Sequence, residues 1–277
     1  MRVICAPSAT DVVYCGIAVD AGTRDELPDE NGLAHFCEHL TFKGTHRRRS
    51  WHILNRMESV GGDLNAYTGK EETIYYTAFL KEHFARAVDL LADIVLGSTY
   101  PQTEMNKEVE VVIDEIESYN DSPSELIFDD FEDMIFVGSS LGHNILGCKS
   151  ALMKYTRDDL LRFVARTYNT DQMVFSVIGN VSAKRFKDTC DRYFGGMGES
   201  LRGFTRDAVV SVASFSKELH RKCYQAHCIL GGRAYNLNDE RRVVLSLLTN
   251  LLGGPSANSL LNLAVRERNG LAYNIEA

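Results

Sequence analysis

The chain has 277 residues, of which 44% are hydrophobic and 25% are charged, the composition of an ordinary globular protein with enough apolar residues for a core. Its formal net charge of −8 argues against a nucleic-acid partner. No run of residues reaches the ~18 apolar residues of a membrane span, so we expect no membrane partner either.

Cysteine usage indicates the redox compartment. The seven cysteines are odd in number and include no C-x-x-C pair, which is typical of reduced and mostly buried thiols. The first residues lack the long apolar region of a signal peptide. Together these features predict a cytoplasmic protein.

The first predicted elements are two strands, over residues 2–5 and 11–20, and the second is almost wholly apolar, as a central strand would be. A polar loop then leads to a predicted helix over residues 32–43, which ends near Gly44. The basic run at residues 46–49 is expected to be a solvated loop, with a phosphate or acidic-substrate site as the alternative.

The middle of the chain alternates strand and helix patterns. Threonine, isoleucine and tyrosine predict a hairpin over residues 63–67 and 72–79, and an apolar run predicts a buried strand over 173–179. Apolar residues at helical spacing predict helices between these strands and after them. They are expected over residues 50–60, 81–98, 103–119, 124–137, 156–166 and 182–194.

Residues 195–218 differ in character, because glycines become frequent and few bulky residues keep a regular spacing. We place a boundary here and divide the chain into domains 1–205 and 206–277. The second part is expected to repeat the order of elements seen in the first. Its predicted elements are strands over residues 224–230 and 271–275, a helix over 238–252 and a further helix to about 267.

The predicted helix over residues 32–43 carries His35, Glu38 and His39 in the pattern H-x-x-E-H. Residues four apart lie about 40° apart around a helix, so the two histidines share a face and Glu38 lies close to it. Two such imidazoles can bind one Zn²⁺, and the carboxylate can reach a water on the metal. Cys37, inside the motif, is interpreted as a packing residue rather than a ligand.

A third ligand is needed, because catalytic zinc takes three protein ligands. The best candidates lie in the predicted helix over residues 103–119, where Glu108 and Glu115 are seven apart and share a face. The residues alone leave open whether either glutamate is a ligand or a solvated surface acid.

These motifs resemble those of the M16 zinc metallopeptidases, the pitrilysin or inverzincin family, and most closely the bacterial branch similar to mitochondrial processing peptidase. The resemblance runs from about residue 2 to the end of the chain. The matching motifs, in order, are Gly32 to His39, Phe42 to Thr45, Asn65 to Thr68, the pair Glu108 and Glu115, and Arg266 to Tyr273.

The resemblance implies an α+β fold of the LuxS/MPP-like metallohydrolase type. Such a fold has a mixed, mostly antiparallel sheet packed against helices, followed here by the start of a second similar domain. Second domains of the family run further than this one, so we expect a truncated chain. The family closes two halves into a chamber, which implies a homodimer or a related M16 subunit as partner.

The resemblance also implies a metal site with one Zn²⁺ per chain. His35, His39 and Glu115 would hold the ion, and Glu38 would act as the general base on a water that the metal activates. Glu108 would lie behind the ligands, where it hydrogen-bonds a histidine or tunes Glu38.

A peptide substrate would meet two further groups of residues in the family. Asn65, Ala66 and Tyr67 would pair with the substrate backbone as a neighbouring strand, although an ordinary hairpin fits these residues as well. Arg266 and Tyr273 would reach the substrate from the second domain and stabilise developing negative charge. An ordinary junction between a helix and a strand is the alternative for these two.

The expected function is a zinc-dependent endopeptidase that hydrolyses short or unfolded peptides. One alternative is a catalytically weak or partner-dependent M16 subunit that acts mainly in assembly or peptide binding. Another is a non-proteolytic metalloenzyme of the LuxS type. An intact set of His35, Glu38, His39 and Glu115 argues against the first alternative, and Glu115 with the chain length argues against the second.

Overall fold

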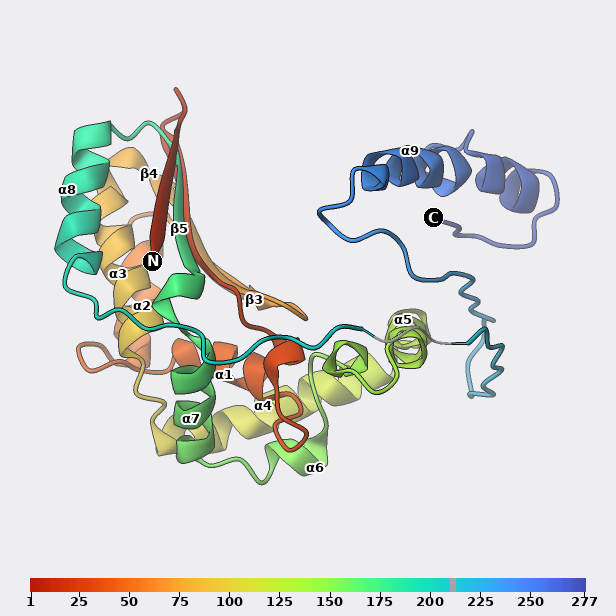
Figure 1. Cartoon of the computed structure of the whole chain (residues 1–277), viewed down its shortest axis with the longest axis horizontal. Helices are drawn as coiled ribbons and strands as arrows, with labels where there is room; N and C mark the ends of the chain where they lie inside the picture. The colour runs from red at the N-terminus through yellow and green to blue at the C-terminus, as the bar shows by residue number, and fades with distance from the viewer. Residues whose placement is uncertain (210–212) are drawn as a thin grey trace. The chain divides into compact units, whose positions relative to one another are not determined.

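The structure is a computed structural model that describes residues 1–209 and 213–277. The chain divides into two compact units, Met1–Ile229 and Leu230–Ala277. The first unit contains the sheet and the helices α1 to α8, and the second contains α9 (Figure 1). Among the described residues, no helix combines the length and apolar character needed to cross a membrane.

A five-stranded sheet forms the centre of the first unit, in the order β1-β5-β2-β4-β3 (Figure 1). β1 and β5 run parallel, and all other neighbours are antiparallel. The predicted mixed, mostly antiparallel sheet is therefore confirmed, and the apolar strand β2 is central. The strands are β1 Arg2–Pro7, β2 Val12–Val19, β3 Asp63–Thr68, β4 Thr73–Leu80 and β5 Met173–Gly179.

Helices α2, α3 and α8 lie on one side of the sheet (Figure 1). Alternate residues of β2, among them Val13 and Ile17, are fully buried against this layer, as the two-residue period of a strand requires. The predicted apolar stripe of α3 is buried in the same core. The helices of the first unit are α1 Leu33–Thr41, α2 Ser50–Glu58, α3 Phe84–Gly97, α4 Gln102–Asn120, α5 Pro123–Ile135, α6 Lys149–Leu152, α7 Arg157–Thr167 and α8 Ala183–Phe194.

A second apolar core joins α1 to α4 and α7. Leu33, Phe36 and Leu40 of α1 are fully buried in it, together with Val112 of α4 and Phe163 of α7. This core holds α1 and α4 side by side, which matters because each carries residues of the predicted metal site. Single-turn 3₁₀ segments occupy Thr23–Asp25, Lys81–His83, Ser140–Gly142 and Thr170–Gln172.

The basic run at residues 46–49 differs from the prediction. His46, Arg47 and Arg49 are exposed, but the side chain of Arg48 is only 12% exposed. Its guanidinium binds the carboxylates of Asp89 and Asp93, two buried acids of α3. A solvated loop is therefore the wrong description of Arg48, because buried carboxylates need a charged partner.

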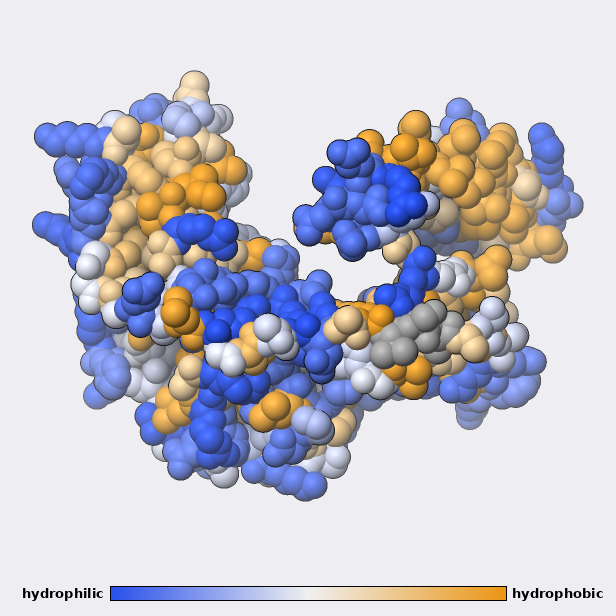
Figure 2. Space-filling view, in the orientation of Figure 1, coloured by the Kyte–Doolittle hydropathy of each residue, from blue (hydrophilic) through white to orange (hydrophobic). Residues whose placement is uncertain are grey.

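The second unit contains α9 Arg241–Gly253 and a π-helical turn at Asn262–Glu267. The predicted helix over residues 238–252 is confirmed with slightly shifted bounds. Hydrophobic residues gather over α9 (Figure 2), where several large apolar side chains are more than 45% exposed. They are Val243, Val244, Leu247, Leu248 and Leu251.

The strands predicted over residues 224–230 and 271–275 are not present. Both segments are irregular, and every strand of residues 1–209 and 213–277 lies at or before Gly179. A strand is stable only when a neighbour satisfies its backbone N–H and C=O groups. Neither segment has such a neighbour among the described residues, so its β-propensity alone does not produce a strand.

Candidate metal centre

Helix α1 presents the predicted motif because its apolar residues face the core. Leu33, Phe36, Cys37 and Leu40 follow helical spacing and are fully buried. Cys37 is thus a packing residue, as predicted, and its thiol lies 3.5 Å from the hydroxyl of Tyr100. Burial raises the pKa of this thiol to about 12, which disfavours the thiolate that a metal would bind.

The structure brings His35, His39 and Glu115 together. One nitrogen of each histidine and one carboxylate oxygen of Glu115 lie within 4.8 Å of one another. The Nε2 atom of His35 is 3.9 Å from Oε1 of Glu115, and Nε2 of His39 is 3.5 Å from Oε2. The two imidazoles come from successive turns of α1, and the carboxylate comes from α4.

The protonation state of His35 suits a ligand. His35 is only 7% exposed. This burial, together with the neighbouring His39, lowers the pKa of His35 to about 3. The ring is therefore neutral at physiological pH, which is the form that binds metals. Nδ1 of His35 is buried without a hydrogen-bond partner among the described residues.

Glu108 orients the second histidine. Its Oε1 lies 3.0 Å from Nδ1 of His39, and its Oε2 lies 2.6 Å from Nζ of Lys43. Burial opposes ionisation of Glu108, but hydrogen bonds from His39 and Lys43 outweigh it and lower the pKa of the carboxyl. A carboxylate that accepts Nδ1–H leaves Nε2 of His39 with its lone pair toward Glu115.

Glu38, a residue of α1, extends its side chain to the edge strand β3. The hydroxyl of Thr68, the last residue of β3, donates a hydrogen bond of 2.5 Å to Oε2 of Glu38. Burial raises the pKa of Glu38, although the bond from Thr68 opposes this. A carboxyl with a raised pKa is better matched to proton transfer near neutral pH than an ordinary surface glutamate.

Strand β3 pairs with β4 on one side, and it is the last strand of the sheet. Asn65 and Tyr67 are exposed, and Ala66 is half-buried. The edge of β3 that does not pair with β4 ends at Thr68, whose hydroxyl contacts Glu38. This arrangement leaves backbone groups of β3 for an added strand to bind, except that the N–H of Ala66 already donates to Oδ1 of Asn65 at 2.8 Å.

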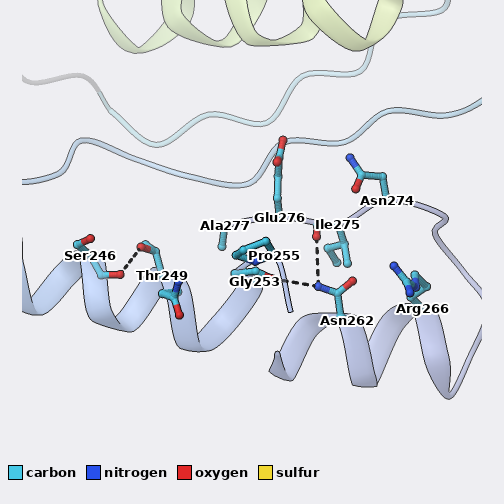
Figure 3. A pocket seen from close by; sticks show the side chains of 12 residues that line it. Ser246, Thr249, Gly253, Pro255, Asn262, Arg266, Asn274, Ile275, Glu276 and Ala277 are labelled. Atoms are coloured by element: carbon cyan, nitrogen blue, oxygen red, sulfur yellow. Dashed lines mark hydrogen bonds between the residues drawn. The ribbon is translucent and has the colours of Figure 1, made fainter. Parts of the chain in front are cut away.

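Arg266 and Tyr273 belong to the second unit. Arg266 ion-pairs with Glu267 at 2.9 Å and lines a pocket beside Asn262 (Figure 3). In that pocket the Asn262 amide donates to the carbonyls of Gly254 and Ile275. The side chain of Tyr273 is largely exposed. The predicted roles of Arg266 and Tyr273 in substrate binding stay predictions.

Sequence reasoning assigned no role to two residues that contact the site. Lys43 lies one helical turn beyond His39, so the sequence spacing alone could have placed it near the motif. Thr68 is separated from Glu38 by 30 positions. Only the packing of α1 against the end of β3 makes this second contact.

Comparison with known proteins gives the family. Residues 2–149 match the family described as Insulinase (Peptidase family M16), and residues 154–277 match the Peptidase M16 inactive domain. The chain belongs to the M16 peptidase family. An uncharacterized zinc protease of Bacillus subtilis, YmxG, is 37% identical over 95% of this chain and 64% of its own length.

Other M16 relatives are similar over different lengths. The mitochondrial-processing peptidase subunit beta of Saccharomyces cerevisiae is 37% identical over 69% of this chain and 41% of that protein. The crystal structure of a protease from Helicobacter pylori superposes with a TM-score of 0.84 at 20% identity, and covers 98% of this chain and 67% of that one. The M16 fold is thereby shown. The chain spans less than two thirds of the length of these two sequence relatives.

Proposed function

We propose that this M16 chain carries the metal centre of a zinc-dependent endopeptidase that hydrolyses short or unfolded peptides. The observation that carries the proposal is the convergence of His35, His39 and Glu115 within 4.8 Å, with Glu38 on α1, the helix of both histidines. Relatives named zinc protease support the same conclusion. The fine roles assigned to individual residues are part of the proposal.

The donor set fits Zn²⁺. Two imidazole nitrogens and one carboxylate oxygen are a common set for catalytic zinc. His35 is buried and neutral, and the contact of Glu108 with Nδ1 of His39 leaves Nε2 of that ring free. When bound, Zn²⁺ would lower the pKa of a water and polarise a carbonyl group.

The chain's own residues would handle the proton and the peptide. Glu38 would accept a proton from the attacking water and deliver it to the leaving amine nitrogen. Thr68 holds one oxygen of Glu38, so the other oxygen is available for this transfer. A peptide added to the free edge of β3 at Asn65, Ala66 and Tyr67 would run toward the same carboxylate.

The working protein would include a partner. We propose a second copy of the chain or a related M16 subunit, because one relative is named as a subunit of a processing peptidase. Arg266 and Tyr273 would contact the substrate from the second unit. A partner-dependent subunit that binds peptides without cleaving them is the second candidate, because the chain spans only part of the length of its relatives.

The test compares wild-type protein with Glu38→Gln. We expect about one zinc per chain in both, and chelator-sensitive hydrolysis of a quenched fluorescent peptide only by the wild type, with a loss of about 100-fold or more in the variant. Glu117→Gln is the matched control, because Glu117 is an exposed acid of α4 paired with Lys149, and it should leave zinc content and hydrolysis unchanged.

Two other results would change the conclusion. Zinc in the wild type without any hydrolysis would favour the partner-dependent subunit. Absence of zinc from the wild type after incubation with the metal would contradict the proposal itself.

A further inference from the structure

The metal helix α1 begins without a capping side chain of its own. Its N-cap residue is Gly32, with φ of +85°. A Cβ at this position would lie 2.7 Å from both Cα of Gly147 and the carbonyl oxygen of Leu146. Serine, threonine, aspartate and asparagine, the usual N-cap residues, are therefore excluded by the backbone conformation and by the close approach of residues 146–147.

A residue from outside the helix supplies the missing acceptor. Oε1 of Glu26 accepts the backbone N–H of Ala34 at 2.8 Å, and Oε2 accepts that of Gly32 at 3.0 Å. Glu26 is 7% exposed, so water competes little for these bonds. The first N–H groups of a helix have no partner within the helix. Burial raises the pKa of Glu26 to about 8, although the N–H groups of Ala34 and Gly32 oppose this, so the contact rests on the two acceptor oxygens rather than on a fixed negative charge.

We propose that Glu26 is a positioning residue of the metal centre, which fixes the first turn of α1 and thereby His35. The inference rests on the proposed zinc site. Ala34, whose N–H binds Glu26, is joined directly to His35 through the peptide bond. His39 lies one turn later, where hydrogen bonds within the helix already hold the backbone.

Loss of this contact would act unequally on the two histidines. Without Glu26 the first turn would fray, as uncapped helix ends do. His35 would then leave its place beside Glu115, while His39 would keep its contact with Glu108. The outcome is a helix that still folds but offers the metal one ligand fewer.

The experiment measures zinc affinity by competition with a chromogenic chelator, together with the unfolding midpoint of the metal-free chain. In Glu26→Gln an NH₂ group replaces one acceptor oxygen and faces a backbone N–H. We expect zinc binding to weaken about tenfold or more, as for other residues that orient metal ligands. Glu26→Asp keeps both acceptor oxygens on a shorter side chain, and its zinc affinity should fall between those of Glu26→Gln and wild type.

Glu30→Gln is the matched control. Glu30 lies in the same loop, and its side chain accepts the N–H of Leu27 and binds Arg166, but makes no bond to the backbone of α1. Its loss should lower the unfolding midpoint and leave zinc affinity within about twofold.

Distinct results identify which idea fails. Wild-type zinc affinity in Glu26→Gln, or in Glu26→Asp if the first variant does not fold, would overturn the inference while the zinc site stands. Equal weakening by Glu30→Gln would overturn it too, because the effect would then be general destabilisation. A wild-type chain that binds no zinc would refute the proposed function, and the inference with it.

Discussion

Lys43 is the residue that places a positive charge behind the predicted metal centre. Its Nζ lies 2.6 Å from Glu108, whose other oxygen contacts His39. Glu108 is a mostly buried acid, so it depends on these two partners for its orientation and charge. Lys43 therefore acts on His39 only indirectly, through its contact with Glu108.

Lys43→Met should weaken zinc binding without removing a ligand. We expect a loss smaller than the roughly 10–100-fold seen when a direct partner of a ligand is removed, because Glu108 still contacts His39. Lys107→Met is the matched control, since Lys107 pairs with Glu104 on the exposed side of α4. Chelator competition measures both variants, and equal affinities in the two would show that Lys43 does not contribute.

Residue patterns predicted part of this site because part of it is local. His35 and His39 are four apart on one helix, so their shared face follows from helical geometry alone. The contacts of Thr68 with Glu38 and of Glu26 with the start of α1 follow from tertiary packing. No spacing rule connects residues that meet only after a strand or loop folds against the helix.

Helix α3 carries two buried acids among its mostly apolar residues. The side chains of Asp89 and Asp93 are 7% and 4% exposed, and both bind Arg48. Thr45 also donates to Asp93 at 2.9 Å. These bonds fix the loop that follows α1 onto α3, and so connect the metal helix to the helical layer on the sheet.

Asp93→Asn should destabilise the chain strongly, although the change is nearly isosteric. We expect a loss of about 3 kcal/mol in the free energy of unfolding, because Arg48 loses one of two buried counter-charges. Asp11→Asn is the control, since Asp11 pairs with Lys81 at an exposed site and such pairs contribute about 0–1 kcal/mol. Urea unfolding measures both, and a loss of under 1 kcal/mol for Asp93→Asn would contradict the burial argument.

The same elements show where pattern reasoning fails. The run at residues 46–49 was predicted to be a solvated loop because it is basic, but the acidic partners of Arg48 lie on α3, some 40 positions later. The strands predicted over residues 224–230 and 271–275 failed for the opposite reason. Their composition is suitable, but the described residues offer them no strand to pair with.

For the molecule as a whole, sequence patterns predicted the sheet and the helical layers of the first unit closely. Period-two and helical spacings are local properties of the sequence. The apolar stripes that they predict are buried in the two apolar cores of the first unit. The path of the chain after α8 is harder to predict, because residues 195–209 have few apolar residues in register. Here charged side chains rather than an apolar stripe hold the segment in place.

Arg206 attaches this segment to the rest of the first unit. Its guanidinium makes two bonds to the carboxylate of Asp25, at 2.8 and 2.7 Å, and one of 2.8 Å to the backbone carbonyl of Glu71. It also pairs with Asp20 at 2.8 Å. One side chain thus joins the segment to the turn between β3 and β4 and to the loop that contains Glu26.

Arg206→Ala should release this segment and destabilise the first unit. The side chain of Asp25 is fully buried, so removal of its cation leaves an unpaired charge in the interior, at a loss of about 3 kcal/mol or more. Chymotrypsin should then cleave after Phe204 several times faster than in wild type, since local opening controls proteolysis. Arg221→Ala, which removes a more exposed pair with Asp130, should leave cleavage after Phe204 unchanged. Wild-type rates in Arg206→Ala would mean that Arg202 and the backbone bonds of Ser200 suffice to hold the segment.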